Sequence, residues 1–100
     1  MSDAASLVAA WARADAAKKR EIACHHQAIL LQDHATLHFE RLGLSGYAAL
    51  ARGRARHAVV ALQTALDERA ETDARRSLFV ARHGLGPEAW TPPEVTRRVL

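Results

Sequence analysis

Helix-breaking residues occur at few places in this sequence, and their distribution is the strongest constraint on its fold. Gly43 and Gly46 lie close together near the middle of the chain, five breakers gather after residue 83, and only Gly53 stands elsewhere. Two long stretches of high helix propensity lie between these breakers, which predicts an all-α protein. The expected elements are a helix over about residues 3–41, a turn over 42–45 and a helix over about 46–83.

Local signals at the ends of these stretches support the same division. Gly43 suits the left-handed position that closes a helix, and Ser45 suits the cap of the next helix. The run from Thr91 to Glu94 has the pattern of a capping box with proline in the first helical turn, which predicts a short C-terminal helix within residues 84–100. We expect one helical domain over residues 1–100.

The charge pattern predicts that the two long helices form an antiparallel hairpin. Folding the chain about the turn brings a basic run on the first helix beside acidic residues on the second, so opposite charges face each other. It also brings one acidic residue of the first helix near two arginines. These sets are Lys18, Lys19 and Arg20 beside Asp67, Glu68 and Glu71, and Asp33 near Arg54 and Arg56.

The apolar residues predict that the hairpin associates with something else. Those of the second helix fall on one broad face, whereas those of the first spread around much of its circumference and need more than one neighbour. A homodimer that forms a four-helix bundle would cover them, and so would a different protein docked on the hairpin. The residues expected at the interface are Ile29, Leu30, Leu37, Leu62 and Leu66.

Three histidines form the candidate metal site. His34 and His38 are four residues apart and so lie on one helical face, and the antiparallel pairing brings His57 roughly level with them. Three imidazoles could hold a transition metal such as zinc. The alternative is that these side chains are half-exposed and bond to one another, to water or to carboxylates.

Four arginines near the turn form the candidate nucleic-acid site. Arg41, Arg52, Arg54 and Arg56 make a positive collar in a chain of formal net charge +3 and pI near 9.8. A collar of this kind can bind a phosphate backbone without reading bases. The alternative is that these arginines are solvated surface residues.

The segment from Arg52 to His57 resembles the Arg-x4-6-His signature of HEPN-type ribonucleases. The resemblance implies metal-independent RNA cleavage by a dimer of helical bundles, with these two residues at a shared cleft. It covers six residues, and the segments Arg20 to His25 and Arg76 to His83 match the same loose pattern. No family membership or catalytic residue is inferred from it.

Composition narrows the functional class. With 49% hydrophobic and 25% charged residues the chain is typical of a folded globular protein, and no run approaches the length needed to span a membrane. A lone Cys24 and the lack of a leader pattern lead us to expect a cytoplasmic protein. We expect a non-enzymatic binding or regulatory protein that self-associates and engages a protein partner. The alternatives are a nucleic-acid-binding regulator and a histidine-based metal sensor.

Overall fold

The computed structural model describes residues 3–84, which form two long α-helices. Helix α1 spans Asp3–Arg41 and helix α2 spans Ser45–Arg82, and no strand occurs within the described residues. The two helices and the turn expected from the breakers are thus confirmed, with bounds that agree to within one residue. The short C-terminal helix expected within residues 84–100 lies outside the described residues, which end at Gly84.

The turn between the helices is built on the C-terminal cap of α1. Gly43 has a φ of 73°, and its amide donates to the carbonyl of Glu40 at 3.0 Å. The amide of Leu44 donates to the carbonyl of Phe39 at 2.9 Å, which completes a Schellman motif. Helix α2 begins at once, because Leu44 already accepts a bond from the amide of Ala48 at 3.0 Å. Ser45, expected as the cap before α2, is therefore its first residue.

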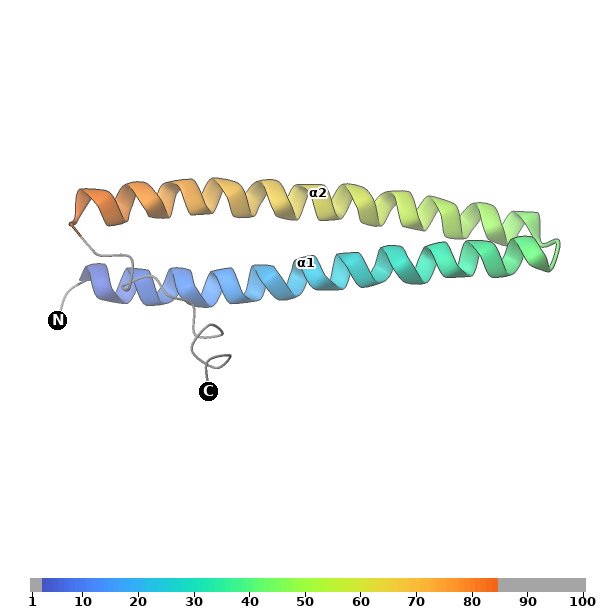
Figure 1. Ribbon diagram of the computed structural model, residues 1–100, viewed down its shortest axis with the longest axis horizontal. Coiled ribbons are helices and arrows are strands. Elements are labelled where there is room, and N and C mark those ends of the chain that lie inside the picture. Colours follow the sequence, from blue (N-terminus) through green and yellow to red (C-terminus); the bar gives the residue numbers. More distant parts are fainter. Residues whose placement is uncertain (1–2, 85–100) are drawn as a thin grey trace. The chain divides into compact units, whose positions relative to one another are not determined.

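The chain divides into two compact units, which we describe separately. The turn unit is Glu21–Leu66, and the described part of the terminal unit combines residues 3–20 with residues 67–84. In each unit a segment of α1 packs against an antiparallel segment of α2 (Figure 1). The hairpin predicted from the charge pattern is thus present.

In the turn unit α2 presents small residues to α1. Its buried residues are all alanine and are three, four or seven residues apart, whereas the residues of α1 that face them are larger and half-buried. This heptad spacing is that of two helices packed along one seam, and alanine allows their backbones to approach closely. The seam residues are Ala48, Ala51, Ala55, Ala58 and Ala65 on α2, with Ile22, Ile29, Gln32 and Phe39 on α1.

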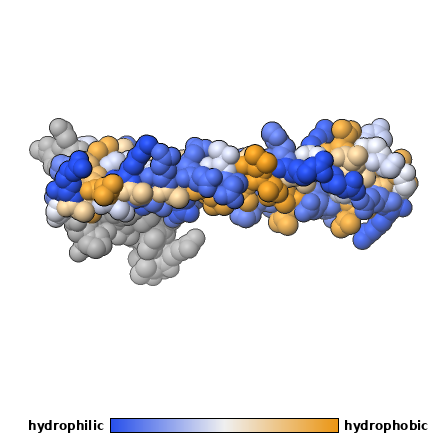
Figure 2. Space-filling model, turned by 90° about the horizontal axis from the view of Figure 1, so that it is seen from above, coloured by the Kyte–Doolittle hydropathy of each residue, from blue (hydrophilic) through white to orange (hydrophobic). Residues whose placement is uncertain are grey.

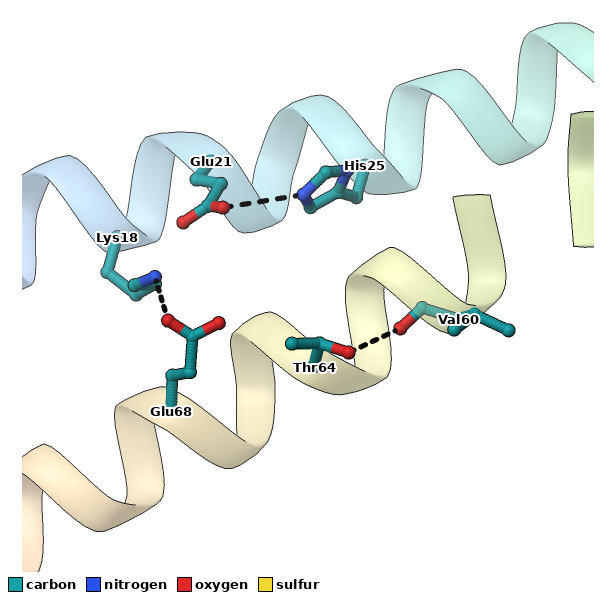
Figure 3. Close-up of polar contacts among 6 residues, drawn as sticks. All are labelled: Lys18, Glu21, His25, Val60, Thr64 and Glu68. Atoms are coloured by element: carbon teal, nitrogen blue, oxygen red, sulfur yellow. Dashed lines mark hydrogen bonds and ion pairs between the residues drawn. The ribbon is translucent and has the colours of Figure 1, made fainter. Parts of the chain in front are cut away.

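Charged side chains enter the seam in the terminal unit. Asp15 is buried, and its two carboxylate oxygens lie 3.2 Å from Nε of Arg69 and 3.4 Å from Nζ of Lys19. Nearby, Nζ of Lys18 donates to Oε2 of Glu68 at 3.2 Å (Figure 3). The pairing of the basic run with the acidic group is therefore confirmed for Lys18 and Glu68.

The other charge pairing expected from the sequence does not form. Asp33 makes no ion pair with Arg54 or Arg56 in the part of the chain that the structure describes; instead Arg52 pairs with Glu40. Asp33 and Glu40 are seven residues apart and lie on the same side of α1, and the bond to Arg52 is made at the position nearer the turn.

Candidate interaction surface

Large apolar side chains are exposed mainly in the turn unit. Of the twelve such residues in the described part of the chain, ten belong to this unit, so most of its large apolar residues remain unburied by the hairpin. In Figure 2 apolar residues, in orange, interrupt the hydrophilic surface in patches. A monomer rarely leaves this much apolar surface in contact with water. The ten residues are Leu30, Leu31, Leu37, Leu42, Leu44, Tyr47, Leu50, Val59, Val60 and Leu66.

Most of these residues fall on two opposite faces of the turn unit, because the seam between the helices separates them. One face, here called the Leu30 face, is marked by the ion pair between Glu40 and Arg52, which crosses from α1 to α2. Helical spacing places four exposed apolar residues on it, interleaved with four charged ones. They are Leu30, Leu37, Val59 and Leu66, with Asp33, Glu40, Arg52 and Arg56.

The opposite face, here called the alanine groove, is less charged and is hollowed. A concavity of about 400 Å³ is lined by residues of both helices, among them Ala35, Leu50 and Arg54. A more open one of about 500 Å³ continues over the turn and shares Tyr47 and Leu50 with it. Further along the same face, helical spacing places mainly small or apolar side chains and one more charged residue, Glu21. The groove comprises Glu21, Cys24, Ala28, Leu31, Ala35 and His38 of α1 with Tyr47, Leu50, Arg54, His57, Ala61 and Thr64 of α2.

The structure divides the interface residues expected from the sequence into two groups. Ile29 and Leu62 are half-buried at seam positions, so they already contribute to packing within one chain. Leu30, Leu37 and Leu66 are exposed on the Leu30 face and remain available for association.

Two of the three candidate metal ligands, His38 and His57, lie on the face of the alanine groove, and His34 lies apart from them. His34 is on the side of α1 opposite the seam, and His38 lies beside Phe39 with 5.8 Å between the ring centroids. His57 is exposed on α2, on the face of the alanine groove. Within the described residues no group of three or more histidine, cysteine, aspartate or glutamate side chains could hold a metal ion. The metal site stays a prediction.

The four candidate nucleic-acid contacts are exposed but do not share one face. Arg52 and Arg56 lie on the Leu30 face, where Arg52 is bound to Glu40, whereas Arg54 lines the alanine groove and Arg41 is the last residue of α1. The side chains of Arg41, Arg54 and Arg56 have no ion pair with any residue in 5–84. Arg52 and His57, the pair in the ribonuclease-like segment, lie on opposite faces of one chain.

Comparison with known proteins adds no assignment: no family model, curated protein or solved structure matches this chain. In residues 3–84, neither helix is apolar over a stretch long enough to cross a bilayer. The candidate site is therefore inferred from the surface of the described residues alone.

The alanine groove was missed by the sequence reasoning. Its signal is the spacing of Ala28 and Ala35, seven residues apart on α1, with Ala61 at the matching position of α2. Small residues add little apolar area, so they do not stand out in a search for hydrophobic faces, although they mark where another helix can approach closely.

Proposed function

We propose that the protein is a non-enzymatic helical binding protein that acts through self-association and through a macromolecular partner. The observation that carries this proposal is the exposure of ten large apolar residues within the turn unit. Burying apolar surface contributes roughly 25 cal/mol per Å², so covering these residues supplies a substantial driving force for association.

The two faces of the turn unit suit the two roles. A homodimer that forms a four-helix bundle covers one face and leaves the other open to a different protein. The separate character of the faces supports this division, since charges are interleaved on the Leu30 face and sparse in the alanine groove. An interface that must be opened and closed by a partner is commonly more polar than a permanent one.

Sedimentation equilibrium over a hundredfold range of protein concentration tests the self-association. We expect a mass near twice the chain mass of 10.9 kDa at the higher concentrations. A mass of one chain at every concentration would overturn the proposal.

Nucleic-acid binding is the second candidate, favoured by the three arginines without an ion pair in the described residues and by the exposed ring of Tyr47. Phosphate contacts would come from Arg41, Arg54 and Arg56, while Arg52 is neutralised by Glu40. Binding of single-stranded RNA or DNA that weakens steeply with salt supports this candidate. No retention on heparin at low salt excludes it.

A further inference from the structure

The alanine groove has a charge at each end of an otherwise uncharged stretch. Arg54 lines the groove near the turn, and Glu21 lies on the same side of α1 about two turns beyond Ala28. Histidines apart, the groove residues between them are small, apolar or neutral. The positions of these two charges decide what can cover the groove.

The pairing of the helices fixes how far apart the charges are. Glu40 pairs with Arg52, and the ring centroids of Phe39 and Tyr47 are 5.5 Å apart. A residue of α1 therefore lies level with the residue of α2 for which the two residue numbers add to about 89. Arg54 is then level with Ala35, and both line the same concavity. Ala35 and Glu21 are each seven residues from Ala28, which is about 10 Å along the helix in either direction.

The side chains that line the groove are smallest midway between the two charges. Ala28 lies there on α1, and Ala61 is level with it on α2. Both are half-buried, since they flank the seam. Helices approach one another most closely at small residues, so another pair of helices would cross the groove here.

We propose that the alanine groove is closed by the same groove of a second copy, with the two chains antiparallel about a two-fold axis at Ala28 and Ala61. This inference rests on the proposed self-association and specifies its surface. In this arrangement Arg54 of each chain comes level with Glu21 of the other on either side of the axis, reaching across from α2 to α1, while Leu31 packs beside Ala28.

Charge distinguishes this occupant from the other ways of stacking two copies. A parallel pair would place Arg54 against Arg54 and Glu21 against Glu21, which is unfavourable for both. Glu21 keeps 45% of its side chain exposed although it lies 3.7 Å from His25 of its own chain (Figure 3). Its carboxylate can therefore accept a bond from a second chain.

The area of overlap makes this a weak dimer. With the axis at Ala28, the turn units of the two chains overlap from Glu21 to Ala35, a stretch about 20 Å long and about 20 Å wide, so each chain would bury roughly 400 Å² there. The total of roughly 800 Å² lies in the range of weak and transient interfaces.

Charge reversal tests the proposal on the full chain. The variants Arg54→Glu and Glu21→Arg should each weaken the dimer about tenfold or more in sedimentation equilibrium, because each places like charges in contact. The double variant restores opposite charges and should return the dimer constant to within a few-fold of the wild type. Circular dichroism of each variant is the control that checks that it remains helical.

Adjacent leucines provide a matched pair of variants. Leu30 and Leu31 are 65% and 58% exposed but lie on opposite faces, so Leu31→Glu should dissociate the dimer and Leu30→Glu should leave it intact. A wild-type dimer in which the double charge reversal gives no rescue, or in which Leu30→Glu dissociates as fully as Leu31→Glu, overturns the groove as the interface and leaves self-association standing. A wild-type monomer overturns both.

Discussion

At the scale of single residues, alanine determines how closely α1 and α2 approach in the turn unit. Every buried residue of α2 in this unit is alanine, and Ala65 is only 1% exposed. Each alanine buries little apolar area, but it costs almost no side-chain entropy and leaves room for the larger residues of α1. The seam is therefore sensitive to added volume rather than to loss of it.

Substituting Ala65→Leu should destabilise the protein by about 1 to 3 kcal/mol, because the larger side chain forces the helices apart or into strained rotamers. The matched control is Ala49→Leu, at an exposed position of the same helix, which should change the free energy of unfolding by less than about 0.5 kcal/mol. Urea denaturation measures both. Equal effects of the two substitutions would show that Ala65 is not at a tight contact.

Asp15 is the buried charge whose removal should matter most in the terminal unit. Its side chain is 6% exposed and accepts from Arg69, so Asp15→Ala should cost about 1 to 3 kcal/mol by leaving Arg69 and Lys19 without this carboxylate. The double variant Asp15→Leu with Arg69→Met replaces the pair by apolar groups and should recover much of that loss. Chemical denaturation of both variants decides the point, and a wild-type stability for Asp15→Ala would contradict this role.

At the scale of elements, glycine ends the helices and the sequence alone located these ends closely. Gly43 and Gly84 have positive φ, and the observed helices end within two residues of each. The face of α1 that packs on α2 was not predictable in the same way, because apolar residues occur around most of its circumference. Burial selects Ile22, Ile29 and Phe39 for the seam and leaves three leucines outside it.

Alanine substitutions at two glycines should change the free energy of unfolding in opposite directions. Gly43→Ala should destabilise the protein by about 1 kcal/mol or more, because its φ of 73° is unfavourable for a residue with a Cβ. Gly53→Ala should stabilise by about 0.5 to 1 kcal/mol, since Gly53 lies inside α2 and a Cβ there meets only Arg56 at 3.9 Å. Thermal unfolding of the two variants, followed by circular dichroism, checks the signs. Destabilisation by Gly53→Ala would indicate a neighbour packed on that side of α2.

At the scale of the whole molecule, the sequence predicted that the hairpin associates with another molecule, but it did not predict through which face. The sequence shows that apolar residues occur around most of the circumference of α1, and in the structure several of these leucines are exposed on two faces. The separation of those faces depends on which positions the seam occupies, so Leu31 and Leu50 could not be told apart from Leu30 and Leu37 beforehand. The histidine metal site and the arginine nucleic-acid site remain predictions. The residues of each site lie on more than one face of the chain.

The central claim is that the chain self-associates and that a second copy covers the alanine-groove face of the turn unit. The most direct test is the mass of the wild-type protein by sedimentation equilibrium, compared with that of Leu31→Glu. The account predicts about twice 10.9 kDa for the wild type and a single chain for the variant at the same concentration. A wild type that sediments as one chain throughout, or a variant that remains fully dimeric, would contradict it.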